Sequence, residues 1–158
     1  MEKTYTVKEF IDLYNRNKNW AFVRKYIDVK TYVPVLEKME ILNEAMSAIE
    51  HEDGLITKYN SVESVIGFIL AIVAAYTNIV PESYVNYQEY DLLRQNGEAL
   101  NLLLEDIGSD YEEFMNIHEL LMLDRKNENS FESTVNKALG KILEDLSPVL
   151  QDLFKERR

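Results

Sequence analysis

The stretch that decides the fold reads Val65-Ile-Gly-Phe-Ile-Leu-Ala-Ile-Val-Ala-Ala-Tyr76. A helix built from it is apolar on every side, and such a helix has to be surrounded by other elements. Its β-branched residues Ile66, Ile69, Ile72 and Val73 also suit a strand, which is the alternative, but the length and the alanines favour a helix. The run falls short of the roughly 20 residues needed to cross a membrane. We therefore expect a buried central helix in a soluble, cytoplasmic protein.

Helical patterns continue on the N-terminal side of this run. Thr6 and Glu9 have the spacing of a capping box, which predicts the start of a helix. A second helix is predicted from Pro34. Its apolar face would consist of Leu36, Met39, Leu42, Ala45, Met46 and Ile49. Its polar face would consist of Glu37, Lys38, Glu40, Asn43 and Glu44. Residues 20–27 form either a short helix or an extended arm, and residues 55–59 form a loop or a brief extended piece.

The C-terminal segment 131–155 has the most regular pattern. Its apolar residues alternate spacings of four and three, as in a coiled-coil seam: Val135, Leu139, Ile142, Leu146, Val149 and Leu153. Pro148 interrupts this seam and Ser147 can cap a new helix, so we predict two helices in line or kinked at 147–148. The seam packs into the chain's own core, or it is an oligomer or partner interface; both interpretations stay open.

Three tyrosines follow Pro81 at a spacing of three, namely Tyr84, Tyr87 and Tyr90. On a helix this spacing predicts a stripe, flanked here by acidic residues. Tyrosine is enriched at protein interfaces, so the stripe is a candidate interface. Half-buried helix packing explains it equally well.

Length and composition define the class of protein. The chain has 158 residues with five Gly and three Pro, which predicts one all-α domain over residues 1–158, a compact bundle of five to seven helices. It has no cysteine, which excludes thiol catalysis, cysteine–zinc sites and disulfides. Its net charge of −11 argues against direct binding of nucleic acid, since basic residues supply most of that affinity.

The negative charge is concentrated in the middle of the chain. Residues 51–123 hold thirteen acidic side chains against Lys58 and Arg94, whereas segments 1–50 and 124–158 are each balanced. A solvated acidic face that keeps the protein in solution is the simplest interpretation. A surface for a basic partner, or an imitation of nucleic acid, is the alternative.

Convergent groups of catalytic or metal-binding residues are missing from the sequence pattern. His51 and His118 are each followed by Glu, but the second histidine of a zinc-binding helix is replaced by Leu55 and Met122. Glycine-rich phosphate loops and nucleophile elbows are also absent. We therefore predict a non-enzymatic protein without catalytic, cofactor-binding or metal-binding residues, and with no cofactor.

Three stretches resemble a group of small helical proteins encoded by tailed phages and prophages of Gram-positive bacteria. They are Lys30-Thr-Tyr-Val-Pro-Val-Leu-Glu-Lys38, Ala75-Tyr-Thr-Asn-Ile79, and Tyr90-Asp-Leu-Leu93 with Asn96-Gly97. The resemblance implies a protein that works by binding protein, as a virion assembly or structural accessory protein, located in the host cytoplasm or on the virion. A virion component or a host protein is then the expected partner, with homo-oligomers as a further expectation and no membrane contact. The alternative is an acidic anti-defence inhibitor that binds a host protein by nucleic-acid mimicry.

Overall fold

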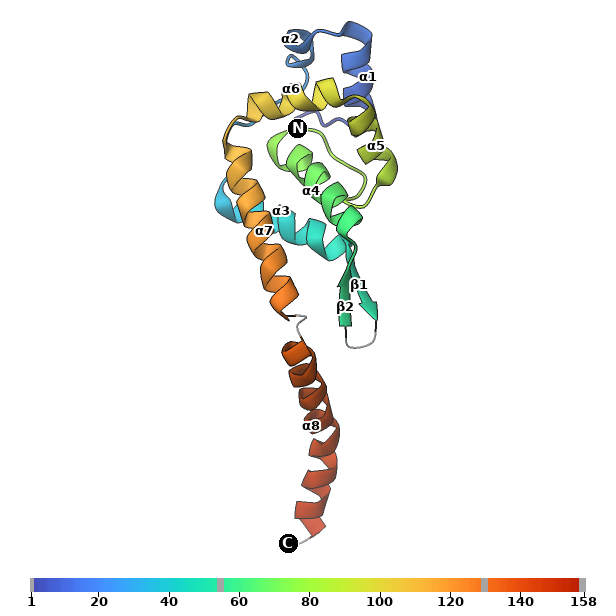
Figure 1. Cartoon of the computed structure of the whole chain (residues 1–158), viewed down its shortest axis with the longest axis vertical. Coiled ribbons are helices and arrows are strands. Elements are labelled where there is room, and N and C mark those ends of the chain that lie inside the picture. Colours follow the sequence, from blue (N-terminus) through green and yellow to red (C-terminus); the bar gives the residue numbers. More distant parts are fainter. Residues whose placement is uncertain (1, 54–55, 129–130, 157–158) are drawn as a thin grey trace. The chain divides into compact units, whose positions relative to one another are not determined.

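A computed structural model describes residues 2–53, 56–128 and 131–156, leaving aside the side chains of residues 53, 56, 57, 128, 131–134, 149–154 and 156. Over these residues the chain forms eight helices and one two-stranded sheet (Figure 1). The predicted helical class is confirmed, but five to seven helices was too few. The sheet pairs β1 (Glu50–Asp53) with β2 (Ile56–Tyr59), so the extended alternative holds for the segment before Tyr59.

The chain divides into two compact units. Unit 1 consists of Met1–Glu50 and Tyr59–Leu121, and unit 2 consists of His51–Lys58 and Met122–Arg158. Among the described residues, none of the helices combines the length and the apolar character that a membrane crossing requires.

Helix α4 (Ser61–Tyr76) is the centre of unit 1, as predicted from its apolar sequence. Asn60 caps it by accepting a hydrogen bond from the Val62 amide at 2.9 Å. Figure 1 shows α4 among α3 (Val35–Ala48), α5 (Tyr87–Gln95), α6 (Gly97–Ile107) and the first half of α7 (Asp110–Glu128). A Cβ atom at Gly67 would lie 3.3 Å from the Tyr84 carbonyl oxygen, so glycine lets the loop before α5 approach α4 closely.

The N-terminal helices are tied to the rest of unit 1 by specific hydrogen bonds. Helix α1 (Val7–Asn17) begins with the predicted capping box, in which the Glu9 amide donates to Thr6 Oγ1 at 3.1 Å. Helix α2 (Trp20–Val23) is the short helix of the two alternatives. The indole N–H of Trp20 donates to Asp106 at 2.8 Å, and Arg24 forms an ion pair with the same carboxylate. The basic and aromatic residues at 20 and 24 thus anchor α2 to α6.

A single side chain, Asn78, joins three segments after the end of α4. Its amide nitrogen donates to the carbonyls of Lys3 at 3.0 Å and Tyr26 at 3.1 Å, and its oxygen accepts from the Asp28 amide. The backbone of Tyr5 pairs with the same segment, through hydrogen bonds with Asn78 and Val80. Asn78 lies within Ala75–Ile79, one of the three stretches that resemble phage proteins. Its hydrogen bonds show that this stretch holds segments of the fold together.

Four of the six residues predicted for the apolar face of helix α3 are buried, namely Leu42, Ala45, Met46 and Ile49, but the start of the helix differs from the prediction. Leu36, placed on the apolar face, is 74% exposed, and Met39 is exposed as well, whereas Lys38, placed on the polar face, is fully buried. The buried positions are Lys38, Leu42, Ala45 and Met46. The physical reason is that Lys38 has two carboxylate partners inside the unit, which compensate the burial of its charge.

Two further sequence predictions are corrected. Helix α8 (Phe131–Glu156) is one continuous helix with Pro148 inside it, where two helices, in line or kinked at 147–148, were expected. Proline removes one backbone hydrogen bond, and a helix continues past it when the remaining turns are favourable. Tyr84 precedes α5, because Asn86 caps that helix and accepts from the Glu89 amide at 3.0 Å.

Candidate functional site

The apolar seam of α8 is exposed to solvent. The exposed fractions are 38% for Val135, 53% for Leu139 and Ile142, and 46% for Leu146. Leu143, next to this seam, is 66% exposed. The side chains of Val149 and Leu153 lie outside the described residues. An exposed row of large apolar side chains on one helix is a candidate interaction surface, and the interface interpretation of the seam stays a prediction.

The three tyrosines are placed differently from one another. Tyr84 and Tyr90 are half-buried and pack against the core of unit 1. Tyr87 is 49% exposed, and its hydroxyl donates to Glu63 at 2.9 Å, an interaction that raises the pKa of Tyr87. Because two of the three rings are turned towards the core, they form no common exposed stripe. An interface role for Tyr84, Tyr87 and Tyr90 stays a prediction.

A buried ionic cluster that the sequence analysis missed lies between α3, α4 and the start of α7. The Lys38 ammonium donates to Asp110 Oδ1 at 3.0 Å and also to Glu113 Oε2. The second oxygen of Asp110 accepts the Tyr76 hydroxyl at 2.7 Å and the Val33 amide at 3.0 Å. One carboxylate therefore joins four segments of unit 1. We call Lys38, Tyr76, Asp110 and Glu113 the Lys38 cluster.

The charges within the Lys38 cluster stabilise one another. Burial alone would lower the pKa of Lys38, but Glu113 and Asp110 outweigh it and raise that pKa. Burial likewise opposes ionisation of Asp110, but hydrogen bonds from Tyr76, Lys38 and Val33 hold its pKa below the usual value. The pKa of Tyr76 is raised, first by burial and then by Asp110.

This protonation pattern favours a structural role for the cluster. A catalytic lysine needs a lowered pKa that frees its lone pair, whereas Lys38 is held as a cation. Both carboxylate oxygens of Asp110 already accept protein hydrogen bonds. The cluster is best understood as a clamp that fixes the start of α7 against α3 and α4.

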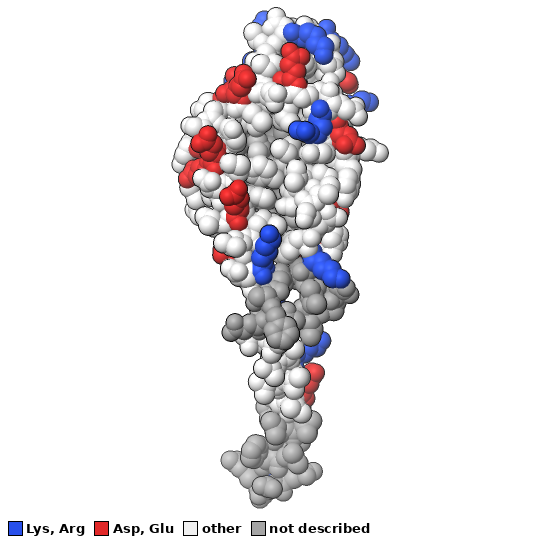
Figure 2. Space-filling view, in the orientation of Figure 1, with Lys and Arg blue, Asp and Glu red and all other residues white. Residues whose placement is uncertain are grey.

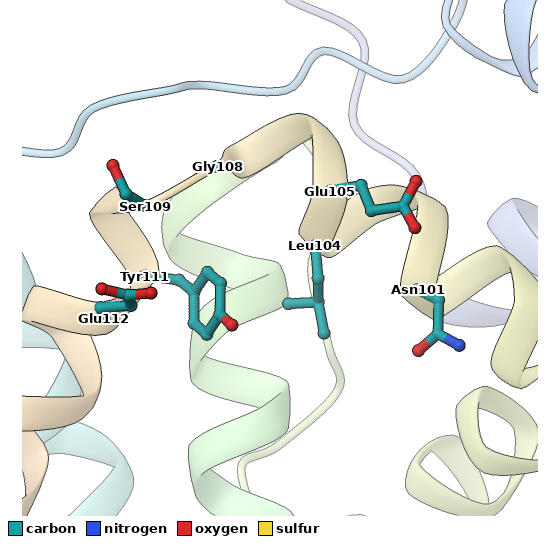
Figure 3. A pocket seen from close by; sticks show the side chains of 7 residues that line it. All are labelled: Asn101, Leu104, Glu105, Gly108, Ser109, Tyr111 and Glu112. Atoms are coloured by element: carbon teal, nitrogen blue, oxygen red, sulfur yellow. The ribbon is translucent and has the colours of Figure 1, made fainter.

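A surface pocket of about 430 Å³ lies where α6 meets α7. It is lined by Asn101, Leu104, Glu105, Gly108, Ser109, Tyr111 and Glu112. Figure 3 shows the carboxylates of Glu105 and Glu112 on opposite sides of this row, with Tyr111 and Leu104 between them. Across the described part of the chain, no group of three or more His, Asp or Glu side chains is placed to hold a metal ion.

The acidic middle of the sequence does not become one uniform surface. Asp106 pairs with Arg24, and Asp110 and Glu113 pair with Lys38, so cations from the N-terminal segment offset part of its charge. Glu89 is buried, and burial raises its pKa. On the face shown in Figure 2, the acidic side chains stand in separate groups with uncharged surface between them, and basic side chains lie elsewhere on the same face.

His118 lies half-buried on α7, with its ring 4.8 Å from that of Phe68. Burial lowers its pKa below the ordinary 6.5, although the charge of Glu119 acts in the opposite direction.

A group whose pKa is lowered on folding binds its proton more readily in the unfolded chain. Below about pH 6.5, unfolding therefore takes up a proton at His118 and stability falls. We expect the free energy of unfolding, measured by urea denaturation, to decline from pH 7.5 to pH 5. His118→Phe should reduce that decline. The raised pKa of Glu89 acts with the opposite sign, but it is present in both proteins and cancels in the comparison. An equal decline in both proteins would show that His118 contributes nothing.

Comparisons with protein-family models, with curated proteins and with solved structures found no match to this chain.

Proposed function

We propose that this chain is a non-enzymatic assembly protein that acts by protein–protein interaction through the apolar face of α8. One observation carries the proposal: Val135, Leu139, Ile142 and Leu146 are exposed on a 26-residue helix at spacings of four, three and four. Fully burying one such side chain contributes about 1.5–3 kcal/mol, and because these four are 38–53% exposed, a covering partner gains about half of that from each. A partner that covers all four gains enough to offset a substantial cost of association.

The biological role we propose is that of a structural or accessory protein in virion assembly. The resemblance to small helical proteins of tailed phages supports this role. The partner would be a virion component, with further copies of the chain as a second kind of partner.

The test is affinity capture of structural proteins encoded by the neighbouring open reading frames, co-expressed with the tagged full-length chain. We expect Leu139→Asp to abolish capture, because a charge at the centre of the seam must be buried without a partner. Lys141→Asp places the same charge on the same helix outside the seam, and should leave capture unchanged. Truncation after Asn129 removes α8 and should also abolish capture.

Circular dichroism should first show that Leu139→Asp and Lys141→Asp keep the helical content of the parent chain. If the truncated chain still captures the same virion component, α8 is not the binding surface and the proposal fails. Equal loss of capture in Leu139→Asp and Lys141→Asp would also contradict the proposal. Binding would then depend on the charge of α8 and not on its apolar seam.

The alternative, an acidic inhibitor that imitates nucleic acid, has less support. It requires carboxylates from several segments to line one exposed face. Three of the thirteen are in ion pairs with Arg24 or Lys38, and Glu89 is buried. We therefore favour assembly through α8.

A further inference from the structure

We infer that α8 assembles with three further copies of itself into a four-stranded coiled coil. This inference rests on the proposed function, in which further copies of the chain are one of the two kinds of partner. It assigns the apolar face of α8 to those copies, and a virion component would then bind the bundle that the four helices form. It goes beyond that function by specifying how many chains meet there.

The heptad register of α8 follows from the order of its spacings. In a heptad, the step from position a to position d is three residues and the step from d to the next a is four. Leu139 and Ile142 are three apart, and Ile142 and Leu146 are four apart. Leu139 and Leu146 are therefore a positions, and Val135 and Ile142 are d positions. The sequence continues this register with Val149 at d and Leu153 at a.

The residue types at these positions select the number of strands. β-Branched residues at a with leucine at d favour two-stranded coils, whereas leucine at a with isoleucine at d shifts the preference to higher-order bundles. In α8 every a position of the seam is leucine and every d position is β-branched. This is the reverse of the two-stranded pattern.

The exposed apolar face of α8 is also wider than a two-stranded seam needs. Leu143 is at heptad position e and is 66% exposed, and Ala138 is at position g. A two-stranded seam uses a and d alone, whereas helices that face the core of a bundle add apolar residues at e or g. In a four-stranded arrangement, Leu143 would be covered by the neighbouring helix.

Charge and proline placement are compatible with self-association. Helix α8 contains five acidic and three basic residues, but none of them is at a seam position, so the apolar layers in which copies of α8 would meet are uncharged. Pro148 is at position c, on the side of the helix away from the seam, and its ring does not enter the layers of a and d side chains. A neutral, self-complementary face fits a second copy of the chain better than a strongly charged partner.

Light scattering of the full-length chain tests this inference directly. We expect a mass of about 74 kDa, which is four times the chain mass of 18.5 kDa. Leu139→Asp should reduce the species to single chains, and Lys141→Asp should leave it at four.

A variant that exchanges the residue types provides the sharper test, because it keeps the face apolar. It combines Val135→Leu, Leu139→Ile, Ile142→Leu, Leu146→Ile, Val149→Leu and Leu153→Ile. This variant should fall to half the mass, two chains, since it restores the two-stranded pattern.

If the parent chain forms any assembly other than four chains, the inference is wrong. It is also wrong if the variant with exchanged residue types still assembles as four chains. A parent dimer that Leu139→Asp dissociates would overturn the four-stranded arrangement and leave the proposed function standing. Failure of the proposed function has a different signature, namely capture of the virion component by the chain that lacks α8.

Discussion

Lys38→Met should lower the free energy of unfolding of unit 1 by about 3–5 kcal/mol at neutral pH, the usual cost of removing one partner from a buried ion pair. Lys38 has no exposed surface and Asp110 has only 12%, so water cannot replace the lost ammonium. The carboxylate of Asp110 would keep its bonds from Tyr76 and Val33 but lose its counter-charge. Urea denaturation followed by circular dichroism measures the loss.

The pH dependence of this loss identifies its cause. Because the cluster lowers the pKa of Asp110, its ionised form contributes stability above about pH 3.9, and this is lost as the pH falls below that value. The penalty of Lys38→Met should therefore shrink in acid, where Asp110 is protonated. Adding Asp110→Asn should recover part of the stability at neutral pH, because the uncompensated charge is then removed.

Glu113→Gln is the matched control within the cluster. Glu113 also accepts from Lys38, but its side chain is 50% exposed, so water screens the pair and we expect a loss below about 1 kcal/mol. If Glu113→Gln costs as much as Lys38→Met, the stabilising partner is Glu113 and the clamp centred on Asp110 is misassigned.

The fold was predictable where a signal was local in sequence. The apolar run 65–76 gave the central helix correctly, and Thr6 with Glu9 gave the start of α1. The Lys38 cluster was not predictable in this way, because a charged residue is assigned to a polar face by default. Its partners Asp110 and Glu113 are 72 and 75 residues away in the chain. The sequence held one signal for the burial of Lys38. It precedes the buried Leu42 by four residues, a spacing that places both side chains on the same face of a helix.

The apolar face of α8 was visible in the sequence, whereas the ionic part of the core of unit 1 was not. Spacings of four and three identified the seam of α8 from the sequence, because all residues of such a face belong to one continuous helix. The periodicity alone could not tell whether that face is buried or exposed, because this depends on how the rest of the chain folds. The tyrosines were predicted less well. Asn86 caps α5, so the helix begins after Tyr84; this cap was visible in the sequence, but the regular spacing of the three rings suggested that all of them lie on one helix.

Phe114→Ala should also cost unit 1 about 3–5 kcal/mol, the range for truncating a buried phenylalanine. Phe114 is fully buried on the first half of α7. Its ring centroid is 5.8 Å from that of Phe68 and 5.7 Å from that of Tyr76, the latter in an edge-to-face arrangement. Alanine would leave a cavity between α7 and α4, and the neighbouring rings would lose their packing partner. Met115→Ala, at the adjacent and partly exposed position, should cost far less.

Phe114 and the Lys38 cluster should not act independently. Tyr76 packs on Phe114 with its ring and donates its hydroxyl to Asp110, so a shift of that ring disturbs both interactions. The double variant Lys38→Met with Phe114→Ala should therefore be less destabilised than the two single losses added together, because each change already loosens the start of α7. Strict additivity in urea denaturation would mean that the packing and the ionic cluster hold α7 separately. A deficit of 0.5 kcal/mol or more, about the smallest coupling that contacting residues show, would establish Tyr76 as the link between them.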